Sequence, residues 1–185
     1  LGYPGSGKGT QAKLLAEKYN LTYISSGKML REEIKNGTEI GRKAEPIMAE
    51  GGIVPDELTL PLIESKIKRH TDTNGFIFKG FPRTIIQTYI LDGLLRKLNS
   101  SVSCMMEINV PPFELMERLH ARSQTEKRRA YDMSVDVILH RMRMYENKTV
   151  PVAEYYRSIN KHCSINGVGN EQEVFERLSE QVESA

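Results

Sequence analysis

Cysteines are scarce in this sequence, and long apolar runs are missing. The 185 residues include two cysteines, Cys104 and Cys163, whose separation fits neither a metal-ligand spacing nor a disulfide framework. We therefore expect a reducing, cytoplasmic compartment and exclude a disulfide-stapled secreted module. No apolar run approaches the ~20 residues that a membrane-spanning helix needs, and no basic-then-apolar leader opens the sequence. We therefore expect no membrane as a partner.

Neither sign of charge is in clear excess. There are 26 lysine and arginine residues against 24 acidic residues, which gives a net charge of +2. This balance gives no reason to expect nucleic acid as a partner. Hydrophobic residues make up 39% of the chain and charged residues 27%, as is typical of globular proteins. A chain of this length can bury well over half of its unfolded surface, so we expect a single domain over residues 1–185.

Apolar strand patterns alternate with amphipathic helix patterns along the chain. The strand patterns cover residues 21–25, 76–78, 102–110 and 163–166. The helix patterns cover residues 11–18, 28–35, 38–50, 56–70, 85–98, 112–120, 135–146, 152–156 and 171–182. Such alternation predicts a parallel sheet with helices on both faces. We also expect Pro61 to bend or delay its helix and Pro151 to separate two helices, because proline removes a backbone hydrogen bond.

A glycine-rich loop with one lysine opens the sequence as Gly2-Tyr3-Pro4-Gly5-Ser6-Gly7-Lys8-Gly9-Thr10. Glycines allow successive N–H groups to line an anion site, and the N-terminus of the following helix adds partial positive charge. Lys8 can reach the β and γ oxygens of a nucleotide, and Thr10 can offer its hydroxyl to a phosphate or a metal. Gly9 separates Lys8 from Thr10, so the generic nucleotide-binding pattern is matched imperfectly. Phosphate binding is still favoured over a surface turn.

The glycine-rich loop also bears on the start of the chain. A phosphate loop of this kind follows a strand, and here it begins one residue after Leu1. We therefore expect most of that first strand to lie upstream of Leu1.

Together these segments resemble the adenylate kinases and their nucleoside monophosphate kinase relatives. The matching segments, in order, are the glycine-rich loop, Ile24-Ser25-Ser26-Gly27 with Arg31, Gly52-Ile53-Val54-Pro55-Asp56, Gly80-Phe81-Pro82-Arg83-Thr84 with Gln87, Arg118-Leu119-x-x-Arg122, Tyr145-x-x-x-Thr149-x-Pro151-Val152 and Ile165-Asn166-Gly167. The resemblance implies an α/β, three-layer fold of the P-loop NTPase type with a five-stranded parallel sheet flanked by helices. It also implies a helical lobe for the nucleoside monophosphate at residues 26–54, a short lid at residues 123–132, and a monomer.

The resemblance implies reversible phosphoryl transfer from ATP to AMP, giving two ADP. The implied ATP-binding residues are Gly5, Ser6, Gly7, Lys8, Gly9, Thr10, Arg118 and Val168. The implied AMP-binding residues are Ser26, Gly27, Arg31, Ile53, Val54, Gly80, Arg83 and Gln87. The implied catalytic residues are Lys8, Arg83, Arg122, Arg141 and a lid arginine that is either Arg128 or Arg129. Arginine suits these roles because its guanidinium group holds two phosphate oxygens and keeps its charge.

Gln87 and Thr84 favour AMP as the acceptor. An amide presents a donor and an acceptor together, which suits the amino group and ring nitrogen of adenine. Relatives that act on pyrimidine monophosphates typically have asparagine where this chain has Thr84.

The sequence departs from the family at two positions associated with magnesium. Mg²⁺ is the implied cofactor, bound through the ATP phosphates and water, but Lys28 and Lys79 stand where the family has aspartates. Missing carboxylates should weaken the outer shell of the ion, whereas lysines could neutralise phosphate directly. We expect no metal ligand from the protein itself. In the lid, Asp132 takes the place of the first expected acid and Met133 replaces the second.

These departures leave two further hypotheses open. One is a catalytically weak or inactive adenylate-binding relative that acts as a sensor or interaction module. The other is a kinase of a different small acceptor, such as shikimate or gluconate, which would require the segment from Gly80 to Gln87 to match by coincidence.

Overall fold

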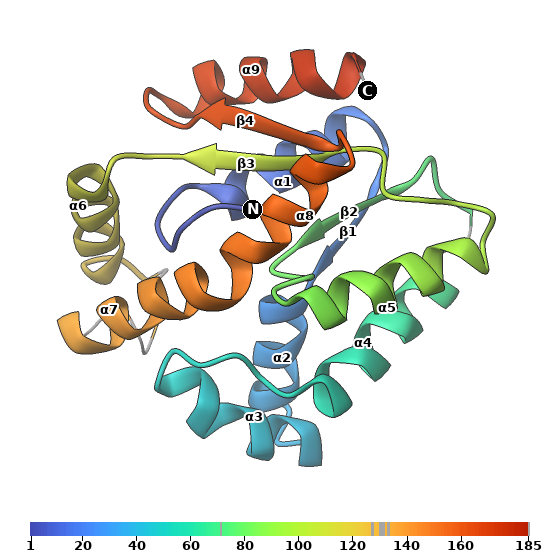
Figure 1. The fold of residues 1–185 in the computed structure, drawn as a ribbon. Coiled ribbons are helices and arrows are strands. Elements are labelled where there is room, and N and C mark those ends of the chain that lie inside the picture. Colours follow the sequence, from blue (N-terminus) through green and yellow to red (C-terminus); the bar gives the residue numbers. More distant parts are fainter. Residues whose placement is uncertain (71, 127, 130–131, 133, 185) are drawn as a thin grey trace.

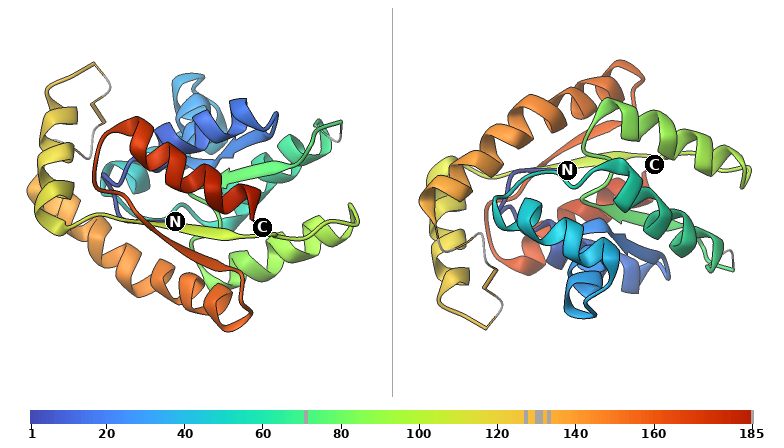
Figure 2. Two further views of the ribbon diagram at one scale, coloured as in Figure 1. Left: turned by 90° about the horizontal axis from the view of Figure 1, so that it is seen from above. Right: turned by 90° about the horizontal axis from the view of Figure 1, so that it is seen from below.

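The computed structural model describes residues 1–70, 72–126, 128–129, 132 and 134–184, and it has parallel strands between layers of helices (Figure 1). Strand β1 (Thr22–Ser25) pairs in parallel with β2 (Phe76–Lys79), so that Ser25 lies beside Lys79. Strand β3 (Met105–Asn109) pairs in parallel with β4 (His162–Asn166). Helices α1 (Lys8–Lys18) and α9 (Glu171–Glu183) cover one face, and α5 (Ile85–Arg96) and α8 (Val150–Ser158) cover the other (Figure 2). This arrangement confirms an α/β fold.

The remaining described elements surround this core. Helices α2 (Ser26–Lys35), α3 (Glu39–Ala49) and α4 (Asp56–Lys68) gather below the carboxyl end of β1 in Figure 1. Helix α6 (Pro112–Ser123) follows β3, and α7 (Val135–Met144) runs back toward the strands. A π-helical turn, η2 (Tyr145–Thr149), joins α7 to α8.

The predicted five-stranded sheet is wrong, because the described residues form two separate two-stranded sheets. Between β2 and β3 lies a cavity of about 420 Å³, which we call the inter-sheet cavity, and its walls are mostly apolar. The backbone of Leu1 enters this space: its amino group donates to the carbonyl of Met106, and its carbonyl accepts from the Ile108 N–H at 3.1 Å. One residue cannot supply the ladder of backbone groups that would join the two sheets.

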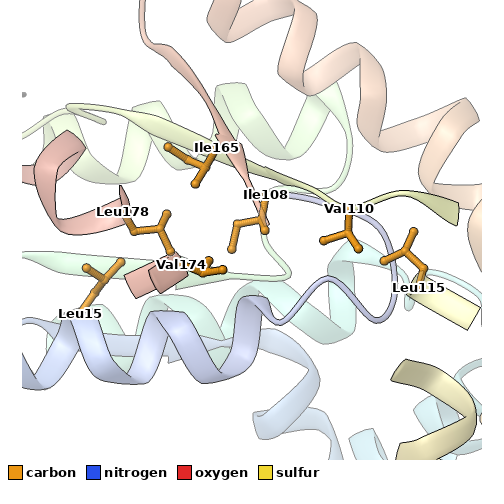
Figure 3. Close-up of a cluster of buried hydrophobic side chains, with 7 residues drawn as sticks. All are labelled: Leu15, Ile108, Val110, Leu115, Ile165, Val174 and Leu178. Carbon is orange, nitrogen blue, oxygen red and sulfur yellow. The ribbon is translucent and has the colours of Figure 1, made fainter. Parts of the chain in front are cut away.

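A cluster of buried aliphatic side chains fixes α1 against β3, β4 and α9 (Figure 3). Leu15 comes from α1, Ile108 from β3, Ile165 from β4 and Leu178 from α9, and each is at most 4% exposed. Burying a side chain of this size contributes about 1.5–3 kcal/mol. Because α1 starts at the glycine-rich loop, this cluster also holds the loop at the carboxyl end of the strands.

Two prolines for which the sequence predicts an effect on a helix lie within continuous helical segments. Pro61 lies on the exposed face of α4, and the helix continues past it to Lys68. Pro151 lies in the first turn of α8, where its missing N–H removes no bond that the helix needs, and η2 links α7 directly to α8. The predicted break at Pro151 is therefore wrong, since the chain stays helical through it. Within the described ranges, every helix is too short or too polar to cross a membrane.

Candidate functional site

The glycine-rich loop ends at the first turn of α1. Gly7 precedes the helix with a φ of 84°, a left-handed conformation that glycine adopts without strain. Its carbonyl accepts from the N–H groups of Thr10 and Gln11 at 3.0 and 3.2 Å. The N–H groups of the first helical turn have no partner within a helix, so those of Lys8 and Gly9 are directed toward a potential anion. The side chain of Ser6 is buried beneath this turn, and Thr10 is exposed.

The side chain of Lys8 lies back over the loop that carries it. Its ammonium group donates to the carbonyl of Tyr3 and to the Ser6 hydroxyl, the latter at 3.0 Å. Burial, followed by the charges of Lys79 and Arg141, lowers the pKa of Lys8 well below its ordinary value. The loop therefore sits in a strongly positive potential.

A second group of predicted residues lines a small cavity beside the loop, which we call the arginine-lined cavity. Its walls include all eight residues predicted to bind AMP, namely Ser26, Gly27, Arg31, Ile53, Val54, Gly80, Arg83 and Gln87. They also include Lys79, Arg129 and Arg141. The free space is about 40 Å³, far below the ~300 Å³ at which ligand pockets begin, so the cavity must open to admit a nucleotide.

Backbone and hydroxyl groups orient Arg83 at one wall of this cavity. Its Nε donates to the carbonyl of Gly80 at 2.9 Å, and the Ser26 hydroxyl donates to the same oxygen at 2.6 Å. The carbonyl of Arg83 accepts from the hydroxyl of Thr149 in η2 at 3.0 Å. The π-helical turn thus ties the helices after the lid segment to the start of α5.

Gln87 is held by protein groups at both ends of its amide. Its Oε1 accepts from the N–H of Arg83 at 2.7 Å, and its Nε2 donates to Oδ1 of Asp56 at 2.6 Å. The side chain is 2% exposed, yet it lines the arginine-lined cavity. The Arg83 N–H and the Asp56 carboxylate therefore fix which end of the amide is the acceptor and which is the donor.

The two candidate lid arginines differ in position. Arg129 lines the arginine-lined cavity and its N–H donates to Oδ2 of Asp132 at 3.1 Å, whereas Arg128 is exposed and is not part of the wall. Arg141, on α7, packs against Gly51, where an added Cβ would come within 2.3 Å of its Cγ. Met133, predicted to replace an acid, lies outside the described residues.

The side chains of Arg118 and Arg122, both on α6, form hydrogen bonds with different partners. Arg118 donates to Glu114 and to the carbonyl of Gly167 at 2.9 Å, and its guanidinium lies 4.0 Å from where a Cβ on Gly7 would be. Arg122 forms a two-pronged pair with the buried carboxylate of Asp132, at 2.8 Å from Nε and 2.6 Å from the terminal nitrogen.

Val168 lies on the exposed surface, 38% accessible, in the turn between β4 and α9. Its N–H donates to Oδ1 of Asn166 at 3.0 Å, and its carbonyl accepts from Arg177 at 2.6 Å. The backbone of this turn is therefore fixed by neighbours on both sides.

A family model and several known proteins match this sequence. The family model described as "Adenylate kinase" matches residues 1–161. The chain belongs to the adenylate kinase family.

Relatives from distant organisms agree with this assignment. An adenylate kinase of Bacteroides fragilis is 41% identical over 99% of this chain and 96% of its own length. One from Flavobacterium psychrophilum is 40% identical over 97% of this chain and 94% of its own. One from Methanothrix thermoacetophila is 34% identical, again over 97% and 94%. Adenylate kinases are phosphotransferases that convert ATP and AMP to two ADP. Membership of this family argues against a kinase of an unrelated small acceptor.

Adenylate kinases take ATP together with Mg²⁺, and the residues of this site do not fit a protein-held shell for that ion. The described residues contain no group of three or more histidine, cysteine, aspartate or glutamate side chains able to hold a metal. Lys79 reaches the phosphate loop, and the carboxylate of Asp132 is taken by Arg122. Magnesium prefers oxygen ligands, which these cations do not offer.

Lys28 and Lys79, the two lysines at positions that the resemblance associates with magnesium, lie in different surroundings. Lys28 is exposed on α2 and lies 3.7 Å from Glu32, whereas Lys79 is partly buried at the end of β2. Lys79 lines both the inter-sheet cavity and the arginine-lined cavity. Burial, followed by the charges of Arg129 and Arg83, lowers the pKa of Lys79 to about 7.

Several residues that shape this adenylate kinase site were not predicted to do so. Asp56 and Thr149 belonged to matching motifs, but nothing in those motifs indicated that they bond to Gln87 and Arg83. Glu114 precedes Arg118 by four residues on one helix, a spacing that could have predicted their ion pair. Nothing in the sequence around Gly51 indicated its contact with Arg141, because only the fold brings the two residues together.

Proposed function

We propose that this chain catalyses phosphoryl transfer between ATP and AMP, with ATP at the glycine-rich loop and AMP in the arginine-lined cavity. The supporting observation is that positively charged side chains from separate segments of the chain lie close to Lys8 and Lys79. The charges that act on Lys8 and Lys79 include those of Arg31, Arg83, Arg122, Arg129 and Arg141. Holding so many positive groups together destabilises the empty site, and bound phosphates relieve it.

ATP binding is assigned to the loop and its neighbours. The N–H groups of the loop and the start of α1 would hold the β and γ phosphates, and Lys8 would leave Tyr3 and Ser6 to join them. Arg118 lies near Gly7 of the loop and donates to the carbonyl of Gly167, next to Val168, and neither Arg118 nor Val168 lines the arginine-lined cavity. We assign them to the nucleoside of ATP.

AMP binding is assigned to the lobe of residues 26–54 and the segment from Gly80 to Gln87. Arg31 and Arg83 would clamp the phosphate of AMP, and Gln87, preset by Asp56, would hydrogen-bond the adenine. Because the cavity holds only about 40 Å³, the lobe must swing outward to load AMP and return afterwards.

In the reaction, an oxygen of the AMP phosphate attacks the γ phosphorus of ATP. The bond from that phosphorus to the β–γ bridging oxygen breaks, and its electron pair stays on the departing ADP. No side chain needs to form a covalent bond, so the residues contribute position and charge. Arg83, Arg122, Arg129 and Arg141 would neutralise the oxygens of the transferring group, and the lid of residues 123–132 would exclude water.

A coupled assay of ADP formation tests this function. We expect ADP from ATP with AMP, and much less with CMP, UMP or GMP as acceptor. If ATP and AMP both bind by calorimetry and no ADP forms, the chain is an adenylate-binding relative without catalysis. We further propose that the active species is a monomer, which sedimentation of the active enzyme tests.

The neighbouring arginines of the lid provide a sharper test. Arg129→Met should lower kcat at least tenfold, because it removes a cation from the cavity wall, whereas Arg128→Met should change it less than twofold. Equal losses in both variants would contradict the assignment of Arg129 as the lid arginine. Circular dichroism of both variants verifies that they fold.

A further inference from the structure

We propose that Lys79 is a catalytic residue of this chain, whose ammonium group contacts the transferring phosphoryl group and supplies part of the positive charge that carboxylate-held magnesium would otherwise supply. This inference rests on the proposed function, since it assumes that two nucleotides meet at this site. It concerns one residue at which the chain departs from its own family.

The position of Lys79 supports the contact. Its backbone ends β2, and its Cε lies 3.9 Å from where a Cβ on Gly9 would be, so the side chain extends over the phosphate loop. The same side chain lines the arginine-lined cavity. Lys79 therefore lies where the space assigned to ATP meets the space assigned to AMP.

The surroundings of Lys79 contain cations and no paired acid. The charges that act on it come from Arg31, Arg83, Arg129 and Arg141, and it is in turn the foremost charge acting on Lys8. Among the described residues, no carboxylate lies within ion-pair distance of Lys79 and no hydrogen bond of its side chain is formed. A buried ammonium group without an acceptor is unfavourable, and a phosphate oxygen would satisfy it.

The contrast with Lys28 makes this assignment specific. Both lysines replace an acid of the family pattern, yet of the two only Lys79 lines the arginine-lined cavity and extends over the phosphate loop. Lys28 is exposed and is near Glu32. A carboxylate at position 79 would repel phosphate. Lys79 instead offers an ammonium group that can bind it.

In the proposed step, Lys79 holds an oxygen of the γ phosphoryl group while the bond to the β–γ bridging oxygen breaks and the bond to AMP forms. Lys79 keeps its protons and transfers none. Because an ammonium group cannot bridge two phosphates as a metal does, magnesium that arrives with ATP would still assist.

Binding of ATP without metal is the first test. ATP in the presence of EDTA is titrated by calorimetry into the wild-type chain, Lys79→Met, Lys79→Arg and the control Lys68→Met. Lys68 is exposed near Glu64 at the end of α4, so its substitution removes the same charge away from the site. We expect Lys79→Met to weaken ATP binding about tenfold or more, Lys79→Arg to retain most of it, and Lys68→Met to match the wild type. Equal affinities for the wild type and Lys79→Met would overturn the proposal.

Proton uptake on binding distinguishes direct contact from a merely structural role. At pH 8 the amine of Lys79 in the empty site is mostly neutral, because its pKa is about 7, and a bound phosphate raises that pKa again. Titrations in buffers of different ionisation enthalpy should show that wild-type binding takes up nearly one more proton than Lys79→Met. Because Lys79 also acts on the charge of Lys8, Lys79→Arg is measured as well: it keeps the positive charge beside Lys8 and takes up no proton at residue 79, so wild-type binding should also exceed it in proton uptake. An unchanged proton uptake in folded Lys79→Met would contradict the contact.

Turnover as a function of Mg²⁺ is the third test. Lys79→Met should lose more of kcat at low Mg²⁺ than at saturating Mg²⁺, and Lys79→Asp should show the steepest dependence on the ion. If wild-type and Lys79→Met kcat respond identically to Mg²⁺, Lys79 does not supply the proposed charge while the adenylate kinase function stands. Absence of ADP from the wild type at saturating Mg²⁺ would instead refute the proposed function.

Discussion

Gly51 is the residue at which the 26–54 lobe touches the helix that carries Arg141. Its φ of +80° is in the left-handed region, and an added Cβ would lie 2.3 Å from Cγ of Arg141. No side chain other than hydrogen fits here unless the arginine moves. The closed position of the lobe and the position of a proposed catalytic cation are therefore set by the same contact.

Gly51→Ala should consequently lower kcat, because it displaces Arg141 from the arginine-lined cavity. A misplacement of about 1 Å in a catalytic group can cost a hundredfold, so we expect a loss of roughly ten- to a hundredfold. Gly37→Ala is the matched control: its φ is +63°, and nothing lies within 4 Å of the added Cβ. Both variants should lose about 1 kcal/mol of stability from backbone strain. Similar kcat values for the two variants in the coupled assay would contradict the argument.

Cys104 and Cys163 show how the fold brings distant residues together. Their sulfur atoms lie 3.1 Å apart, although the sequence separation indicated no pairing, and both thiols are free. Burial, followed by the hydrogen bond to Cys163, raises the pKa of the Cys104 thiol to about 12.

The raised pKa of Cys104 predicts slow alkylation. At pH 8 its thiolate fraction should be far lower than that of a thiol with the ordinary pKa, and the thiolate is the reacting form. Iodoacetamide labelling followed by peptide mass spectrometry measures this rate. The same chain in guanidinium should label rapidly, and rapid labelling of Cys104 in the folded chain would refute the expectation.

At the scale of elements, the lid segment is anchored by one acid. The buried carboxylate of Asp132 accepts two bonds from Arg122 and one from the N–H of Arg129. Two proposed catalytic arginines therefore share a single anchor. Because the side chain of Asp132 is fully buried, its loss cannot be compensated by water.

Asp132→Asn should weaken that anchor, because an amide presents one acceptor oxygen and cannot complete the two-pronged pair. We expect the free energy of unfolding to fall by about 1–3 kcal/mol, because one buried donor loses its acceptor, and kcat to fall with it. Urea unfolding and the coupled assay measure the two effects. Asp136→Asn on the exposed start of α7 should change stability by less than about 0.5–1 kcal/mol, as a helix-terminal charge does. A stable, fully active Asp132→Asn would contradict a shared anchor.

The elements themselves were largely predictable from sequence. Apolar periodicity located α1, α5 and α9 to within a few residues, because each buries one face in the core. It did not predict η2, whose Thr149 bonds Arg83, a residue far away in sequence. The predicted break at Pro151 failed because the proline lies in the first turn of α8, where its missing N–H is tolerated.

The residues of the candidate site could be predicted where they belong to recognisable motifs. They could not be predicted where only the folded structure distinguishes them. All eight predicted AMP-binding residues line one cavity: six belong to motifs that follow the neighbouring parallel strands β1 and β2, and Ile53 and Val54 lie between α3 and α4. Periodicity and spacing left Arg128 and Arg129 equivalent, and only the course of the chain around Asp132 distinguishes them. Sequence also grouped Lys28 with Lys79, although solvent surrounds the first and cations surround the second.

At the scale of the whole molecule, we expect the inter-sheet cavity to make the stability of the fold sensitive to pressure. If the space of about 420 Å³ is dry, unfolding removes it and reduces the volume, so hydrostatic pressure should favour the unfolded chain. Ala12, at the wall of this space and 8% exposed, offers a way to reduce it. Ala12→Leu should raise the pressure at the unfolding midpoint, measured by tyrosine fluorescence in a chain without tryptophan. An unchanged midpoint pressure would mean that water already fills the space, so that unfolding would remove little empty volume.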